Sequence, residues 1–233
     1  MRTMVMVLAA ATLAGCGFPR VHTGPSVHET RVIDLGKFEM ARVELKMSVG
    51  ELHVDGGSPN LVDADFDYNV PEWRPRVDSS SSSFRADVKI EQPSGGAAVS
   101  GDSRYIWRLK LNDGVPLNLV THLGTGEATL DLGSVTLRNL QVNMGVGELR
   151  LDLRGHPTND YDVEIHGGVG EATVLLPNSV GISAMARGGI GDISVEGLEK
   201  RNNRWENEAY STSKVRVRLN ITGGVGDIHL RAE

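Results

Sequence analysis

A short glycine-centred pattern that returns six times constrains the fold of this chain more than any other feature. One copy is Met144-Gly-Val-Gly-Glu-Leu-Arg-Leu151, and each copy sets its central glycine just before an acidic residue. The central glycines are Gly50, Gly126, Gly147, Gly170, Gly191 and Gly226, at steps of 76, 21, 23, 21 and 35 residues. Repeats of this length are typical of folds in which one small structural unit stacks on the next.

Apolar residues alternate on both sides of each central glycine, which is the period of a half-buried strand. The alternation changes phase at the glycine, so that in most copies the residue before it and the second residue after it are both apolar, as with Val146 and Leu149. A bend at the glycine would absorb one residue and place both inside, and glycine tolerates the positive φ that such a bend needs. The sequence therefore predicts inward leucines and outward polar residues around one bend: Leu149, Leu151, Leu153; Glu148, Arg150, Asp152.

The three near-equal central steps predict stacked coils, and the two longer steps predict insertions. No segment shows helical periodicity with capping residues. We therefore expect an all-β fold, a repetitive β-solenoid in which each coil covers the apolar face of the next. About 200 residues, 31–233, are expected to form this single domain, because a chain of that length can bury its own core.

The long insertion, about residues 61–117, differs from the repeats because it holds six of the eleven aromatic residues. We expect it to form a sheet that caps one end of the solenoid, since an open stack exposes an unpaired edge. Trp73 lies between two prolines of the insertion, and Gly197–Ser213 is expected to be a polar loop that carries Trp205 and Tyr210. These three rings are candidate contacts for a partner, and the alternative is that they pin their loops.

The N-terminus predicts export. One positive charge in residues 1–3 precedes an apolar run over residues 4–11 and the small-residue stretch Leu13-Ala-Gly-Cys16, which is typical of a signal peptide over residues 1–15. The run is too short to cross a membrane as a helix. Leu13-Ala-Gly-Cys16 also resembles the lipobox of bacterial lipoproteins. That resemblance implies lipid on Cys16, with residues 16–30 as a lipidated tether, and Gly17 implies the outer membrane where the source has two membranes.

Charge and cysteine usage limit the chemistry. Without residues 1–15 the formal charge changes from -6 to -7, because Arg2 is lost. A domain with a net negative charge lacks the basic surface that binding to nucleic acid requires, so we expect no nucleic-acid partner. Cys16 is the single cysteine, which excludes an internal disulfide or a thiolate metal site in the domain.

Acidic and histidine residues recur at repeat positions but do not have ligand spacing. The Gly-Gly-Ile-Gly-Asp copy resembles calcium-binding nonapeptide repeats, yet those repeats return every nine residues. Carboxylates stacked on neighbouring strands repel one another, so they would either bind a divalent cation or form a solvated face on which Arg150 reduces the repulsion. We expect the solvated face. Four histidines occupy comparable positions without converging. We therefore expect no catalytic residue, no metal and no cofactor at these residues: Glu127, Glu148, Glu171, Asp192; His53, His122, His166, His229.

Three further segments resemble a known family. The segment Pro71-Glu-Trp-Arg-Pro75, the strand beginning at Trp107 and the stretch Leu130-Asp-Leu-Gly-Ser134 with its following glycine copies are similar to the bacterial toast-rack domain family of envelope proteins. The part from Gly167 onward also resembles the C-terminal domain of cell-wall-active antibiotic response proteins. The resemblance implies a repetitive β architecture and brings no catalytic residue with it.

The predicted function combines the anchor with the repeat. We expect a non-enzymatic, membrane-anchored envelope lipoprotein that acts as a binding, scaffold or stress-response module. Its partners would be the membrane, through the lipid, and an envelope protein or cell-wall glycan that the sequence does not identify. Two alternatives stay open: a carbohydrate-active enzyme on a β-helix, and a surface adhesin. The oligomeric state is also left open.

Overall fold

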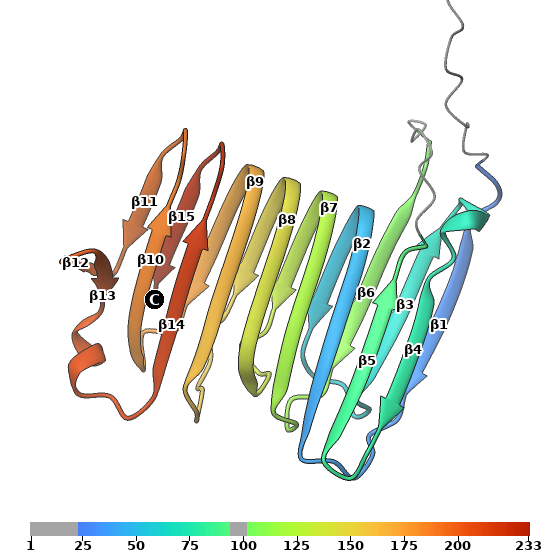
Figure 1. The fold of residues 1–233 in the computed structure, drawn as a ribbon, viewed down its shortest axis with the longest axis horizontal. Coiled ribbons are helices and arrows are strands. Elements are labelled where there is room, and N and C mark those ends of the chain that lie inside the picture. The colour runs from blue at the N-terminus through green and yellow to red at the C-terminus, as the bar shows by residue number, and fades with distance from the viewer. Residues whose placement is uncertain (1–22, 94–101) are drawn as a thin grey trace, which may run out of the picture.

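The computed structural model describes residues 23–93 and 102–233 (Figure 1). The predicted signal peptide and the lipid-bearing Cys16 lie outside these residues. Over the described part the chain forms strands and two short 3₁₀ helices, η1 (Pro71–Trp73) and η2 (Glu208–Ser211). No helix in that part is long and apolar enough to cross a membrane.

The strands fall into long bent strands and shorter straight ones. The long ones are β2 (Met40–Asp55), β7 (Leu117–Asp131), β8 (Leu137–Asp152) and β9 (Tyr161–Leu176). The others are β1 (Val27–Ile33), β3 (Val62–Tyr68), β4 (Arg76–Ser81), β5 (Arg85–Glu91), β6 (Tyr105–Leu111), β10 (Gly181–Arg187), β11 (Ile193–Glu196), β12 (Glu199–Arg201), β13 (Arg204–Glu206), β14 (Arg216–Thr222) and β15 (Ile228–Ala232).

Each long strand bends at its central glycine and so belongs to two layers. The half before the glycine lies in a first layer, ordered β4-β5-β2-β7-β8-β9-β14-β10-β13-β12. The half after it lies in a second layer, ordered β1-β3-β6-β2-β7-β8-β9-β15-β11. The β2–β9 neighbours are parallel and in register, with Gly50 beside Gly126, Gly126 beside Gly147 and Gly147 beside Gly170. The expected all-β, solenoid-like architecture is confirmed.

The stacking order differs from the order of the chain. The last segment of the chain, β14 and β15, lies between β9 and the pair β10 and β11 (Figure 1). The central glycines therefore stack with Gly226 between Gly170 and Gly191. The 35-residue step carries the chain past the outermost coil, and the C-terminal strands insert where both of their edges find partners.

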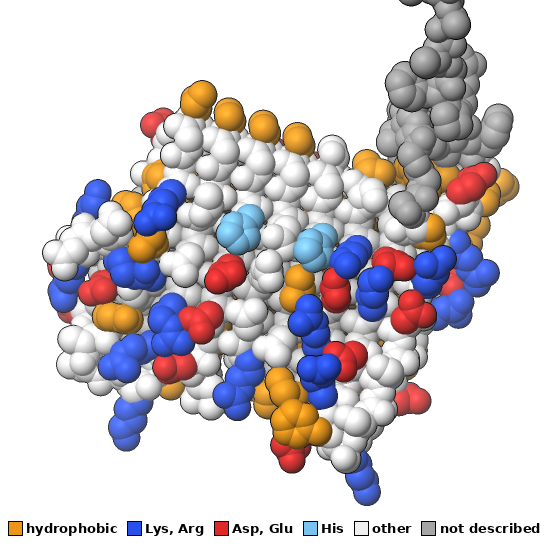
Figure 2. Space-filling view, in the orientation of Figure 1, with side chains coloured by type: hydrophobic (Ala, Val, Ile, Leu, Met, Phe, Trp, Pro, Cys, Tyr) orange, Lys and Arg blue, Asp and Glu red, His pale blue; other side chains and the backbone are white. Residues whose placement is uncertain are grey.

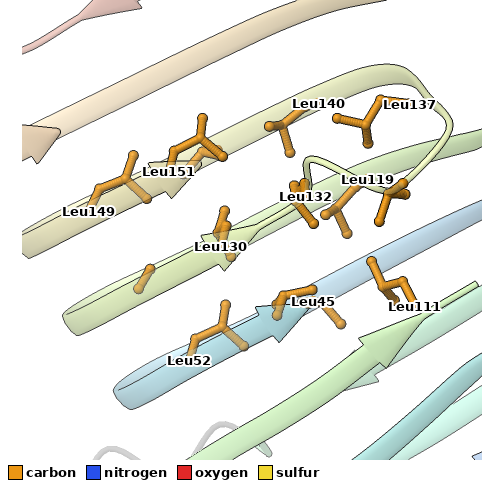
Figure 3. Close-up of a cluster of buried hydrophobic side chains, with 14 of the residues drawn as sticks. Leu45, Leu52, Leu111, Leu119, Leu130, Leu132, Leu137, Leu140, Leu149 and Leu151 are labelled. Atoms are coloured by element: carbon orange, nitrogen blue, oxygen red, sulfur yellow. The ribbon is translucent and has the colours of Figure 1, made fainter. Parts of the chain in front are cut away.

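The core lies between the two layers, and leucine is its most frequent residue. Figure 3 shows leucines from both halves of the bent strands projecting into the space between the layers. Leu149, Leu151 and Leu153 are buried and Glu148 and Arg150 are exposed, as the alternation predicted. The apolar area removed from water here is the main favourable contribution to folding, at about 25 cal/mol per Å².

The insertion closes one end of the stack as expected. Its strands β3 and β6 extend the second layer beside β2, while β5 and β4 extend the first layer. Between the layers its aromatic rings meet edge to face: Phe66 with Trp107 at 5.4 Å between ring centroids, and Trp73 with Tyr105 at 5.5 Å. In the capping sheet these rings occupy the space between the layers that leucines occupy in the repeats.

The tether is shorter than the sequence suggested. Strand β1 begins at Val27 and pairs antiparallel with β3, so the last four residues of the expected tether over 16–30 belong to the sheet. His28 and Thr30 hydrogen-bond the side chains of Asp67 and Asp65 at 2.9 and 2.7 Å. These cross-strand partners lie far away in the sequence, which is why residues 27–30 carried no strand signal of their own.

Candidate binding surface at the glycine bends

The bends depend on glycine for two reasons. Gly147 and Gly170 have φ values of 138° and 143°, and the other four central glycines have similar positive values. Residues other than glycine rarely adopt this backbone conformation. The strands also approach too closely for a Cβ: one built on Gly147 would lie 1.8 Å from the carbonyl oxygen of Gly126. The glycines are therefore bends, as the phase change predicted.

The residue before each central glycine lies outside the bend. Val146, Val169, Val225 and Ile190 are 47, 49, 45 and 72% exposed, although the phase change led us to expect this position inside. The expectation is wrong because the turn places this residue on its convex side. Backbone pairing aligns these residues from strand to strand. We name this line the apolar ridge: Val146, Val169, Val225 and Ile190, continued by the exposed Thr125 and the half-buried Val49.

Bare backbone flanks the apolar ridge. Central glycines lie on one side of it, and a second row lies on the other: Gly124, Gly145, Gly168, Gly224 and Gly189. A Cβ on Gly168 would lie 2.3 Å from the carbonyl oxygen of Gly145, so this row also requires glycine. The ridge side chains therefore stand above their surroundings, and Figure 2 shows hydrophobic side chains in a line along the bend edge. The Gly-x-Gly spacing in five of the six copies is the sequence signal for this second row, whereas the alternation of apolar residues gives none.

A small cavity lies beneath the ridge where the repeats lose a side chain. Met47, Leu123 and Met144 lie three residues before their central glycines, but in the three later copies this place is taken by Gly167, Gly188 and Gly223. A Cβ on Gly167 would meet no atom within 4 Å. The cavity, of about 40 Å³, is lined by Met144, Ile165 and Ile221 among others. This volume suits one or two small molecules such as water, not a substrate.

A row of carboxylates runs parallel to the apolar ridge on the second layer. Glu51, Glu127, Glu148 and Glu171 are direct neighbours in register, and the row continues through Asp227 and Asp192. Neighbouring strands are about 4.8 Å apart, so like charges repel along this row. Two histidines lie beside the row: His53 Nε2 is 3.8 Å from the Glu51 carboxylate, and His229 Nε2 is 3.7 Å from that of Glu171. We name these six residues the carboxylate row.

The other two histidines lie on the outer face of the first layer. His122 and His166 flank Asn143 in register, beside a shallow groove of about 420 Å³. Burial and the neighbouring charge of Lys46 lower the pKa of His122 below its ordinary value. Within the described residues, no group of three or more His, Cys, Asp or Glu side chains is arranged to hold a metal ion.

The three aromatic candidates differ in accessibility. Trp73 lies in η1, is 3% exposed, and its carbonyl oxygen accepts a 2.7 Å hydrogen bond from the Tyr105 hydroxyl. The ring therefore packs in the core instead of facing a partner, because the aromatic cluster of the insertion encloses it. This burial corrects the expected contact role of Trp73 in favour of the pinning role.

Trp205 and Tyr210 lie at the opposite end of the stack and are partly exposed. The expected polar loop over Gly197–Ser213 instead forms β12, β13 and η2, because β13 pairs with the edge of β10. The Lys200 ammonium lies 5.2 Å from the Trp205 ring centroid, and the Arg216 guanidinium lies 5.7 Å from that of Tyr210. Each ring thus has a cationic neighbour on the protein itself, and a contact role for these two residues stays a prediction.

Two family models match the chain. The model described as the N-terminal domain of toast_rack matches residues 22–175, which is more than half of the chain. The model described as cell wall-active antibiotics response LiaF, C-terminal, matches residues 125–230. The second match overlaps the first and extends through the repeats that complete the stack.

One solved structure shows the same architecture. A protein from Clostridium sporogenes described as a "putative cell adhesion protein" is 31% identical, with a TM-score of 0.85, and the alignment covers 90% of this chain and 100% of that one. A "putative adhesin" from Bacteroides fragilis is 11% identical over 87% of this chain and 97% of its own, with a TM-score of 0.33. No curated protein matches. With its family model, its glycine bends and its stacked two-layer sheet in agreement, the chain belongs to the toast_rack family.

Proposed function

We propose that this protein is a non-catalytic binding platform of the bacterial cell envelope, held at a membrane by lipid on Cys16. The observation that carries the proposal is the continuous two-layer stack, which is shared over 90% of the chain with the protein described as a "putative cell adhesion protein". In-register parallel strands hold their outward side chains at fixed spacings of about 4.8 Å. A surface of this kind binds by presenting an ordered array, and its rigidity lowers the entropy cost of association.

The outer faces offer two different arrays. The second layer presents carboxylates near the bends, and farther from the bends Arg154 forms ion pairs with Asp152 and Glu233 at 2.6 and 2.8 Å. The first layer presents Asn143 and His166 beside ion pairs such as that of Arg218 with Asp162. Both faces therefore carry charged groups, and the amides and histidines of the first layer add hydrogen-bonding groups that suit an envelope protein or a cell-wall glycan.

The anchor is tested by replacing Cys16. A Cys16→Ser variant should move from the membrane fraction to the soluble fraction, because a lipid anchor requires the thiol. The unchanged protein, expressed at the same level, is the control. Persistence of the variant in the membrane fraction would show that the protein is held in another way.

The binding platform is tested with charge-reversed faces. The purified protein should bind saturably either to isolated cell-wall sacculi or to solubilised envelope proteins. Glu148→Lys alters the second layer and Glu164→Lys alters the first, with the same change in net charge. We expect one variant to weaken binding at least fivefold and the other to leave it unchanged. Steady release of sugar products, abolished by a single acidic substitution, would instead favour the carbohydrate-active enzyme.

We also propose a role in the response to cell-wall stress, which the description of the second family model supports. Cells that lack the protein should become more sensitive to antibiotics that act on the cell wall, and the unchanged gene should restore resistance. The Cys16→Ser variant should fail to restore it. Unchanged sensitivity of the deletion strain would contradict this role. The binding-platform proposal would not be affected, because the binding experiment tests it separately.

A further inference from the structure

We propose that the apolar ridge rests on the surface of the anchoring membrane, so that the stack stands with its glycine bends toward the lipid. This inference deepens the proposed function, because it relies on the lipid at Cys16. It assigns a partner to a row of exposed hydrophobic side chains that recurs from coil to coil in the described part of the chain. The occupant is a bilayer whose headgroups carry ammonium groups.

The first argument is where the described chain begins. Gly24 donates a hydrogen bond of 2.6 Å to the carbonyl oxygen of Asn69, and Val27 pairs with Tyr68, which in turn pairs with Tyr105. The carbonyl oxygen of Tyr105 faces Gly50, since a Cβ on that glycine would lie 2.4 Å from it. The chain therefore enters the stack at the bend edge, the same edge that carries the ridge (Figure 1).

The second argument is the reach of the chain. Thr23, the first described residue, comes seven positions after Cys16, and an extended chain of that length spans at most about 25 Å. The ridge from Val49 to Ile190 crosses five strand spacings, or about 24 Å. An anchor so close to one end of the bend edge holds the ridge within reach of the surface at high effective concentration.

The third argument is the size and chemistry of the ridge. A stable protein interface buries about 800 Å² on each partner, and a line one side chain wide, flanked by glycine, offers far less. A tethered contact with lipid needs no such area. The neighbouring carboxylate row would repel a second copy of itself, which disfavours a symmetric dimer through this edge, whereas it attracts the ammonium groups of ethanolamine or choline lipids.

The experiment uses the lipid-bearing protein purified from membranes and reconstituted into vesicles of phosphatidylethanolamine and phosphatidylcholine. An environment-sensitive fluorophore is attached to Val169→Cys on the ridge or to Thr158→Cys, an exposed position in the loop between β8 and β9 at the opposite edge. The parent protein should take up no thiol reagent, because its thiol carries lipid. If Val169→Cys does not fold, Ile190→Cys replaces it, since Ile190 is the most exposed residue of the ridge.

We expect the ridge probe to shift to shorter wavelength and to be shielded at least threefold from an aqueous quencher, with the Thr158→Cys probe unaffected. Vesicles rich in phosphatidylglycerol should weaken the shielding at low salt, because the carboxylate row faces like charge. Equal quenching of both probes on protein that sediments with vesicles would overturn the inference and leave the anchor intact. Failure to sediment would overturn the anchor itself. Shielding without vesicles, together with a dimer by light scattering, would assign the ridge to a second copy instead.

Discussion

The carbonyl oxygen of Gly147 lies 1.7 Å from the position that a Cβ would occupy on Gly170. No side chain can enter this contact without separating β8 from β9. Because the same contact recurs along the stack, the glycine bends are positions where a single methyl group disturbs two neighbouring coils at once.

Gly170→Ala should therefore destabilise the protein by about 3–5 kcal/mol, since it adds a clash with backbone to a strained positive φ. Urea unfolding followed by circular dichroism measures the loss. Gly167→Ala, three residues earlier in β9, is the matched control: a Cβ there meets no atom within 4 Å, so stability should stay equal or rise by up to about 1 kcal/mol. Equal losses for the two variants would refute the packing argument.

Asn207 should stabilise the segment of β12, β13 and η2 that lies beside β10 at the far end of the stack. Its side chain accepts a hydrogen bond of 2.9 Å from the Ile182 amide and donates one of 2.7 Å to the Val180 carbonyl. Asn207→Ala leaves both buried groups without these bonds and should cost about 2–3 kcal/mol in urea unfolding. Asn203→Ala, at an exposed turn position nearby, should change stability by less than about 0.5 kcal/mol. A small loss at Asn207 would mean that water replaces its bonds.

The pair of Asp152 and Arg154 should contribute a pH-dependent part of the stability. The hydrogen bond from Arg154 lowers the pKa of Asp152 below its ordinary value of 3.8. As the pH falls, Asp152 therefore takes up its proton first in the unfolded chain. The contribution of the pair to the free energy of unfolding is complete above the ordinary pKa, and it is lost as the pH falls through the lower pKa of the folded state. Arg154→Gln should cost less than about 1 kcal/mol at pH 7, because the pair is partly exposed.

The stability difference between the parent and Arg154→Gln should vanish as the pH is lowered from about 5 to about 2. Unfolding by urea at a series of pH values measures it. Arg138→Gln, which removes the same charge from an exposed position, is the control and should show no such trend. A difference that stays constant with pH would indicate a packing role for Arg154.

Tyr105 should make the fold sensitive to alkali. Burial raises the pKa of its hydroxyl above the ordinary value of 10.0, so the unfolded chain loses the proton first and stability falls as the pH rises above about 10. Tyr105→Phe should cost about 1–2 kcal/mol at pH 7, because the Trp73 carbonyl loses its partner. Its stability should then decline less steeply between about pH 10 and 12. A slope as steep as that of the parent would assign the alkaline loss to other groups.

The sequence by itself determined the repeating unit. A glycine at a change of phase specifies a bend, because only glycine adopts positive φ at so many equivalent positions without strain, and the alternation assigns Leu149 inward and Glu148 outward. The all-β stack and its aromatic capping sheet follow from these local preferences. The resemblance of three short segments to the toast-rack family added the same architecture independently.

The tertiary structure decided the features that depend on distant partners. The place of the last coil, with Gly226 beside Gly170, follows from the pairing of β14 with β9, which no local pattern encodes. Packing against Tyr105 buried Trp73, although its position between two prolines suggested an accessible loop. The convex side of the bend exposed Val169, although the phase of the apolar residues suggested burial. Local chain geometry is determined by each residue and its neighbours, whereas burial and stacking order are set by which surfaces meet once the whole chain has collapsed.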